Sequence, residues 1–208
     1  MEGQSFEELM ASLDDSPQEV VSGANPFVAP PPPPDGVHMF RIKLPEGRWL
    51  STGTSAKGLN WFNINLDLTC EAEGEIYNGL HSYPMISGMI SRSGTSEAIS
   101  FVERTFGAVA GRDFVPSNKG VVQFIKDSAE GALCRAKTEW QLSVQEGVRK
   151  NGKPDYKVKV RGMKNFPPLL DAAGNPVLDK QGNQVYNHIT DLGAARAEVV
   201  EFLPMREA

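Results

Sequence analysis

A row of basic side chains toward the C-terminal end of the chain is the clearest pattern in this sequence that could bind a ligand. Residues 156–161 alternate between an apolar or aromatic residue and a basic one, as in a β-strand with one charged face. Side chains on one strand face recur every two residues, so Lys157, Lys159 and Arg161 would share a face at a spacing of about 6.6 Å. Positive charges at that spacing can follow a polyanionic backbone. The candidate phosphate contacts are Arg135, Lys137, Lys157, Lys159, Arg161 and Lys164.

Aromatic residues on polar surfaces are the second candidate feature. Trp61 alternates with apolar residues and shares its predicted strand face with Asn63 and Asn65, where an indole serves solubility poorly. Phe166 lies in a predicted loop close to the basic row. An exposed ring can stack on a nucleic-acid base, which contributes about 1–3 kcal/mol per base. Two alternatives stay open: an extension of the chain covers Trp61, and the charged strand face is only solvated.

The sequence shows no set of residues typical of catalysis or metal binding. It contains no nucleophile elbow, phosphate-binding P-loop, dinucleotide fingerprint or His-Glu-x-x-His pattern. Cys70 and Cys134 lack the spacing of a zinc site and are expected to be small buried thiols. We therefore expect no enzyme, no metal and no cofactor, although an enzyme with a dispersed site remains a third hypothesis.

Charge is distributed unevenly along the chain. The formal net charge is −5, but residues 1–36 contain seven acidic and no basic side chains. Residues 37–170 contain 18 basic and 13 acidic side chains, and the remainder is again mildly acidic. The pattern predicts a disordered acidic arm over residues 1–36, followed by a basic body.

The predicted arm has two features of its own. It ends in the proline run 30–34, which favours an extended polyproline conformation. Four apolar residues at helical spacing could form a recognition helix on a protein partner, and the alternative is a solubilising tail. These four residues are Phe6, Leu9, Met10 and Leu13.

Periodicity in the rest of the chain predicts a mainly β (α+β) domain. Period-two alternation indicates strands at 37–44, 61–68, 82–91, 132–144 and 156–161, and period 3.6 indicates helices at 93–107 and 121–130. Five strands with a helix between the third and the fourth are typical of an OB-type barrel. A β-sandwich and an α+β sheet with one helical cover are the alternatives.

This interpretation divides the chain into three parts. They are the arm (1–36), a binding domain (37–168) and a C-terminal extension (169–208). Within the extension, two Gly-Asn units over 172–188 suggest a small hairpin or a loop excursion. A last apolar stretch near residue 200 is expected to form a strand whose place the sequence does not determine.

Three segments make the central two-thirds of the chain resemble phage-encoded OB-fold single-stranded DNA-binding proteins. They are NWFNINLDL, SGTSEAISFVERTFG and YKVKVRGMKNFPP. The resemblance implies an OB-fold protein that coats single strands in replication or recombination. It also implies a groove containing Trp61 and the six basic residues named above.

The same resemblance implies partners and a location. Single-stranded DNA is the expected ligand, with RNA as an alternative, and an acidic tail in this family recruits replication or recombination proteins. The acidic arm here is N-terminal, whereas bacterial-type members have it at the C-terminus, so its role is open, as is homo-oligomer formation. We expect no membrane span and an intracellular, cytoplasmic location, in the host if the protein is phage-encoded. The alternative function is a β-type protein-interaction or virion-associated structural module.

Overall fold

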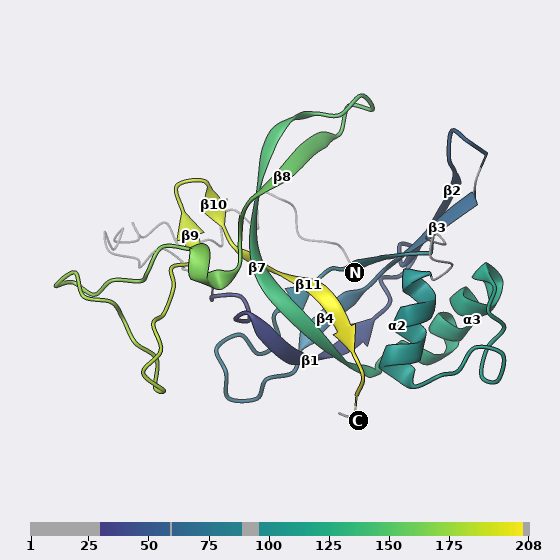
Figure 1. Cartoon of the computed structure of the whole chain (residues 1–208), viewed down its shortest axis with the longest axis horizontal. Helices are drawn as coiled ribbons and strands as arrows, with labels where there is room; N and C mark the ends of the chain where they lie inside the picture. Colours follow the sequence, from purple (N-terminus) through teal and green to yellow (C-terminus); the bar gives the residue numbers. More distant parts are fainter. Residues whose placement is uncertain (1–29, 59, 89–95, 206–208) are drawn as a thin grey trace, which may run out of the picture.

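A curved β-sheet with two helices at one end forms the body of the protein (Figure 1). The computed structural model describes residues 30–58, 60–88 and 96–205. The strands in these ranges are β1 (Gly36–Lys43), β2 (Leu50–Thr54), β3 (Asn60–Asn65), β4 (Asp67–Cys70), β5 (His81–Ser82), β6 (Met85–Ser87), β7 (Leu133–Val148), β8 (Pro154–Arg161), β9 (Ile189–Thr190), β10 (Gly193–Ala194) and β11 (Arg196–Leu203). The helices are α2 (Glu97–Phe106), α3 (Asn118–Ser128) and a short 3-10 turn, Met163–Asn165. The expected mainly β class is confirmed.

The largest sheet has the strand order β11-β7-β1-β4-β5, and β8 pairs with β7 away from this path. The sheet curls, so that its two ends approach each other: the hydroxyl of Ser82 in β5 donates a hydrogen bond to the carbonyl of Ala197 in β11 at 2.9 Å. β11 is the apolar stretch that the sequence left unplaced. It pairs antiparallel with the first half of β7, and Phe202 packs its ring against Phe101 of α2 at 4.7 Å between centroids.

A smaller sheet, β2-β3-β6, continues from the large one. The strand expected over 61–68 is divided at the buried Leu66: β3 pairs with β2 and β6, whereas β4 pairs with β1 and β5. β2 lies in a Gly/Ser/Thr segment that the sequence predicts as loop. It forms a strand because its residues pair in register with β3, from Leu50 opposite Ile64 to Thr54 opposite Asn60.

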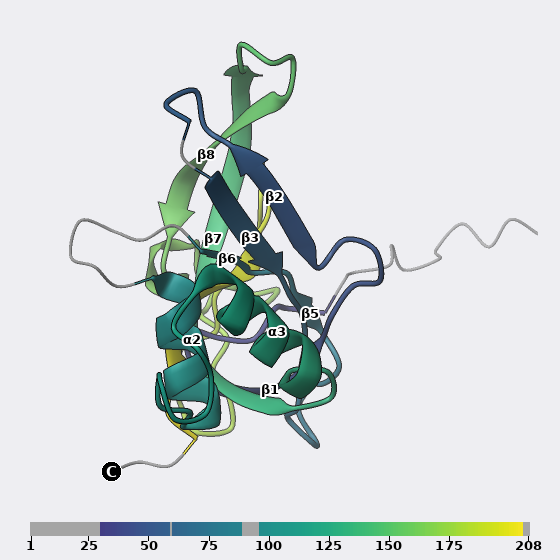
Figure 2. The same cartoon turned by 90° about the vertical axis from the view of Figure 1, so that its right-hand side faces the viewer.

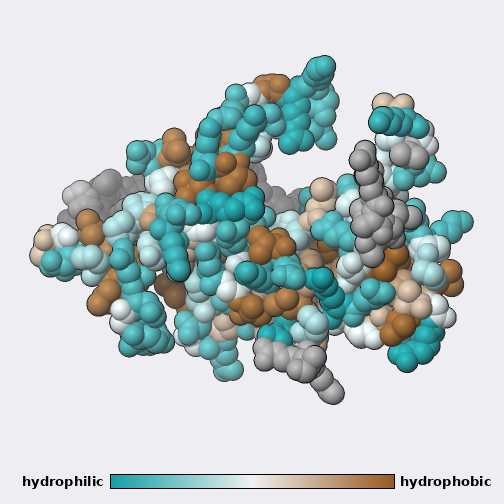
Figure 3. Space-filling view, viewed as in Figure 1, coloured by the Kyte–Doolittle hydropathy of each residue, from teal (hydrophilic) through white to brown (hydrophobic). Residues whose placement is uncertain are grey.

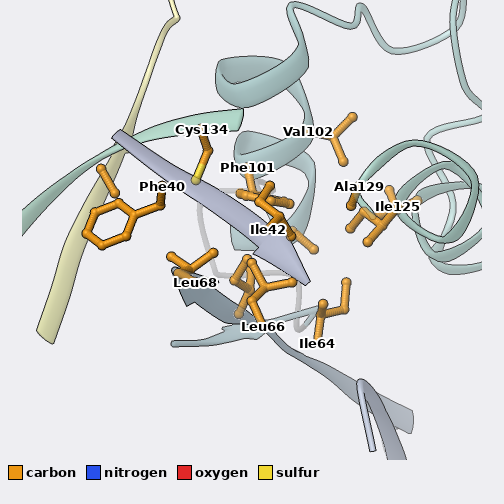
Figure 4. Packing of buried hydrophobic residues seen from close by; sticks show 14 of the residues in the cluster. Phe40, Ile42, Ile64, Leu66, Leu68, Phe101, Val102, Ile125, Ala129 and Cys134 are labelled. Carbon is orange, nitrogen blue, oxygen red and sulfur yellow. The ribbon is translucent and has the colours of Figure 1, made fainter. Parts of the chain in front are cut away.

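Both expected helices are present and lie together at one end of the molecule (Figure 2). α2 ends at Gly107, whose φ of 65° is the left-handed conformation that glycine adopts without strain. α3 begins three residues earlier than predicted, after Ser117, whose hydroxyl accepts a hydrogen bond from the backbone N–H of Gly120. The helices bury apolar side chains against the inner face of the curled sheet (Figure 4).

Both thiols are buried in this core. Cys70 and Cys134 lie opposite Phe40 on the two sides of β1, which places them two strands apart. Two strand spacings are about 9.6 Å, beyond the reach of a disulfide. Burial raises the pKa of Cys70 to about 11 and that of Cys134 to about 12, with a smaller contribution from Glu71 at Cys70.

These thiols should therefore be unreactive in the native protein. At pH 8 Ellman's reagent should titrate no cysteine of the folded chain and two after denaturation. Because folding raises both pKa values above the ordinary 9.0, the neutral thiols contribute full stability below pH 9. That contribution should be lost as the pH rises toward 11 and 12. Fast labelling at pH 8 without unfolding would contradict this burial.

The long hairpin β7–β8 projects from the body (Figure 1). Its base is held by a second apolar cluster of Trp140, Leu142, Phe166 and Ala195. The carboxylate of Asp35, just before β1, accepts hydrogen bonds from the backbone N–H groups of Trp140 and Met163, both at 2.7 Å. Asp35 thus joins the start of β1 to the base of the hairpin.

The structure corrects the expected boundary of the arm. Residues 30–36 belong to the folded body, because the indole Nε1 of Trp140 donates to the carbonyl of Pro33 at 2.8 Å and β1 already begins at Gly36. Thr138 also donates to the carbonyl of Pro34. A polyproline segment can pack in this way because its free carbonyls accept from side chains. Residues 1–29, which include Phe6, Leu9, Met10 and Leu13, lie outside the described residues.

Residues 168–191 form three octapeptide units, where the sequence suggested a hairpin. Leu169, Val177 and Val185 occur at intervals of eight residues, and each N–H donates to a carbonyl of another member, which closes a ring of three hydrogen bonds. A Gly-Asn turn follows Asp171, and another follows Asp179. Each carboxylate stabilises its turn by accepting a hydrogen bond from a backbone N–H group of that turn. These bonds, chiefly from the N–H groups of Asn175 and Asn183, lower the pKa of the two carboxyls.

Candidate functional site

The outer surface of β3, β4, β5 and β6 carries a group of aromatic and amide side chains. Alternation along the strands buries Phe62, Ile64 and Ile86 and turns their neighbours outward. Asn63 lies opposite Ser87, and Asn65 lies opposite Met85. We call this surface the aromatic face, and define it by Trp61, Asn63, Asn65, His81, Tyr83 and Met85.

Trp61 lies at one end of the aromatic face and is half-buried. Its cross-strand partner is Gly53 of β2, and a Cβ atom at position 53 would lie 2.5 Å from Cζ2 of the indole. The indole therefore lies across the backbone of Gly53. Any larger residue at position 53 would clash with the ring in this position. A ring fixed in this way loses little freedom when it stacks on a ligand.

Tyr83 lies at the other end and is 70% exposed. Its ring is stacked on the imidazole of His81, with 6.0 Å between centroids and an interplanar angle of 13°. Nδ1 of His81 lies 2.5 Å from Oδ1 of Asp67, which orients the imidazole under the phenol ring. Met85, 59% exposed, lies between Tyr83 and the neighbours of Trp61. The residues from Trp61 to Asp67 span the length of the aromatic face, and six residues of extended strand correspond to about 20 Å.

Basic side chains continue the same outer surface across β1 and β7. The register places Lys43 opposite Asp67 and Arg41 opposite Thr69. Met39 lies between Arg135 of β7 and Glu71, the residue that follows β4. Arg41 forms an ion pair with Glu71 at 2.6 Å. The sequence predicted two of the cations in this group and missed two others. The four are Arg41, Lys43, Arg135 and Lys137.

The basic row on β8 differs from its prediction. Arg161 lies opposite Gln141, and Lys157 lies opposite Val144. Gln141 and Val144 are three positions apart on β7, so their side chains project to opposite faces of the hairpin. The side chains of Arg161 and Lys157 therefore also project to opposite faces. A register shift after Leu142 causes this change, because a bulge reverses the facing of the residues beyond it. The prediction that Lys157, Lys159 and Arg161 share one face is wrong for this reason.

The same cations are partly neutralised by acids of β7. Lys157 and Lys159 both contact the carboxylate of Glu146, and Arg161 lies 3.7 Å from that of Glu139. Lysine and arginine side chains at the surface exchange such partners readily, since exposed pairs contribute little stability. Lys157, Lys159 and Arg161 are therefore paired in the protein without a ligand.

Phe166 cannot act as the stacking ring that its loop position suggested. It is 3% exposed and packs edge-on against Trp140 at 5.4 Å between centroids. The sequence missed this because the packing partner lies 26 positions away and the loop itself shows no periodicity. Lys164, in the adjacent 3-10 turn, is exposed.

Tyr83, His81 and Met85 are the candidate residues that sequence reasoning missed. The signal was present: His81, Tyr83, Met85 and Ser87 alternate with the buried Ser82 and Ile86. Pro84 and the short strands concealed it, since β5 and β6 contain only two and three residues. Lys43 and Arg41 were likewise visible as the polar side of the first predicted strand.

A scan against protein-family models and a search of the curated proteins both found no match for this chain. In the ranges that the structure describes, no three His, Cys, Asp or Glu side chains are grouped to hold a metal ion. No helix within those ranges is long and apolar enough to cross a membrane. The chemistry of the site is therefore inferred from its own residues.

Proposed function

We propose that this chain is an OB-type barrel in which β11, and not β8, is the fifth strand. On this view β1–β2, β3–β4 and β5–β6 are the first three strands, α2 follows, and β7 is the fourth. Support comes from the pairing of β1 with both β4 and β7 and from the contact between β5 and β11. The β7–β8 hairpin is then a long excursion between the fourth and fifth strands.

We further propose that the protein binds single-stranded DNA without turnover, and that the aromatic face is its binding surface. OB folds bind oligonucleotides on the face of the second and third strands, between the loop after the first strand and the loop after the fourth. The observation that carries the proposal is the position of Trp61 and Tyr83 on that face, beside four cations of β1 and β7.

The chemistry of the face favours a single strand over a duplex. Base rings are free to stack on Trp61 and Tyr83 only when they are unpaired. The cations Lys43 and Lys137 supply the sequence-independent attraction to phosphate. Two hairpins, β2–β3 and β7–β8, project on the same side of the molecule with open space between them (Figure 3).

Tryptophan fluorescence should detect this binding. A poly-dT oligonucleotide should quench the emission, a duplex of equal length should not, and the affinity for the single strand should fall steeply with salt. The Trp61→Phe variant keeps a stacking ring and should bind poly-dT with most of the quenching lost, since Trp140 is buried and Trp49 is packed against the hydrophobic core.

Absence of any response at low salt would contradict the proposal. In that case the protein-interaction or structural-module alternative would be the better interpretation. A response to poly-U equal to that for poly-dT would extend the ligand class to RNA. Equal quenching in Trp61→Phe and the native chain would place the ligand away from the aromatic face.

A further inference from the structure

Two hollows adjoin the first turn of α3. The first has a volume of about 400 Å³ and lies between this turn and the β2–β3 hairpin, with Leu50, Phe62 and Val122 among its apolar walls. The hairpin and the helix are neighbours in both views of the chain (Figure 1, Figure 2). The second hollow, also about 400 Å³, lies between the same turn and the start of α2. Asn118 and Lys119 line both. Hollows of this size, mostly apolar with a few polar groups, are typical of ligand sites.

Backbone N–H groups at the start of α3 are free to bind an anion. The N–H of Gly120 donates to the hydroxyl of Ser117, and the N–H of Val121 donates to the carbonyl of Ser117. The N–H groups of Asn118 and Lys119 come before these two and have no partner among the described residues. They lie at the positive end of the helix dipole, where a phosphate group is stabilised.

A lysine occupies this turn, where an acidic residue would be more favourable. The helix dipole favours acidic side chains in the first turn, and α3 has none there. Lys119 is exposed and forms no ion pair within the ranges that the structure describes. Its charge adds to the positive end of the dipole, so a bound anion would be attracted by both.

A buried hydroxyl beside the same turn lacks a partner. Ser96 precedes α2 and lines the second hollow together with Asn118 and Lys119. It is 3% exposed, and its hydroxyl makes no hydrogen bond in the described part of the chain, not even one that caps α2. Buried polar groups without a partner are rare in proteins. Because a hydroxyl rotates to suit an acceptor, a ligand oxygen in this hollow would satisfy it.

The turn is held in one conformation before any ligand binds. The N–H of Ser117 donates to the carbonyl of Val115 at 2.7 Å. A Cβ atom at position 120 would collide with the same carbonyl oxygen, so only Gly120 allows the segment before α3 to pack so closely. A site fixed in this way loses little freedom when a ligand binds.

We propose that the first turn of α3 is a phosphate subsite for the single strand that binds the aromatic face, an inference that rests on the proposed function. Trp61 connects the two surfaces, because it lies at one end of the aromatic face and also lines the first hollow. A strand that continues past Trp61 places its next phosphate at the N–H groups of Asn118 and Lys119 and its next base between the apolar walls of the first hollow. The hydroxyl of Ser96 donates to a phosphate oxygen from the second hollow.

Replacing Lys119 tests the phosphate contact. Lys119→Gln should weaken the binding of a fluorescent poly-dT oligonucleotide about threefold or more. It should also lower the magnitude of the slope of log affinity against log salt by about 0.7, the value for one phosphate contact with a single strand. The matched control is Lys126→Gln, which removes the same charge from the last turn of the same helix and should leave both quantities close to native. Equal effects of the two variants would overturn the proposal, because they would reflect net charge alone.

Replacing Ser96 separates binding from a structural role. Ser96→Ala removes a hydroxyl that has no partner in the described residues, so the melting temperature should stay the same or rise. The affinity for poly-dT should nevertheless fall about threefold. Thr105→Val removes another buried, unpartnered hydroxyl from α2, outside both hollows, and should leave the affinity unchanged. Native affinity in Ser96→Ala would overturn the contact proposed at the second hollow.

Binding by the native chain distinguishes a failure of this subsite from a failure of the proposed function. If the native chain binds poly-dT and Lys119→Gln behaves as Lys126→Gln does, the subsite is wrong and the proposed function stands. If the native chain does not bind poly-dT at low salt, both are wrong.

Discussion

Replacing Trp61 and Tyr83 together by alanine should lower the affinity for single-stranded DNA by at least about 30-fold, because each stacked base contributes about 1–3 kcal/mol. Each single variant should show part of this loss of affinity. Both rings lie on the outer surface, and Tyr83 is 70% exposed, so the core should be unaffected. The measurement is the dissociation constant for a fluorescent poly-dT oligonucleotide by anisotropy at constant salt.

The matched control is Tyr156→Ala, which removes a tyrosine of similar exposure, 57%, from the hairpin. It should change the affinity about twofold at most, because the ring lies outside the aromatic face and makes no proposed stacking contact. If Tyr156→Ala weakened binding as much as Tyr83→Ala, the loss would not be specific to the aromatic face. Unchanged binding in the double variant would exclude that face as the site.

Removing residues 196–208 should abolish the cooperative thermal unfolding transition. The deletion takes away β11, which pairs with β7 along its length and contributes Phe202 to the packing around Phe101. It leaves the edge of β7 and part of the core exposed to water, and a domain has only about 5–15 kcal/mol of net stability to lose. The smaller change Phe202→Ala should lower the free energy of unfolding by about 2 kcal/mol, because the ring is only partly buried. Near-ultraviolet circular dichroism with temperature measures both effects.

Two N-terminal deletions provide the comparison for that result. Removing residues 1–29 should leave the transition in place, because the described anchors of this end begin at Pro33. Removing residues 1–35 should lower the stability, because the N–H groups of Trp140 and Met163 lose the carboxylate of Asp35. A folded, cooperative chain without residues 196–208 would show that β11 is only an appendage.

Sequence periodicity was sufficient to predict most elements of this protein. The alternation in 132–144 and 156–161 indicated the hairpin, and Ile99, Val102 and Gly107 indicated α2 and its end. These predictions depend on local rules, namely the period of side-chain facing and the conformational freedom of glycine, which neighbours in the chain are enough to satisfy.

Features that depend on contacts between distant residues could not be obtained in this way. The bulge that separates Lys157 from Arg161, and the packing of Phe166 on Trp140, are set by pairing across strands. The same holds for the place of β11 beside β7 and for Pro33 under the indole of Trp140. The sequence by itself determined which residues alternate and which segments carry charge. Only the tertiary structure decided which of those segments share a surface, because burial and pairing are properties of partners brought together from far along the chain.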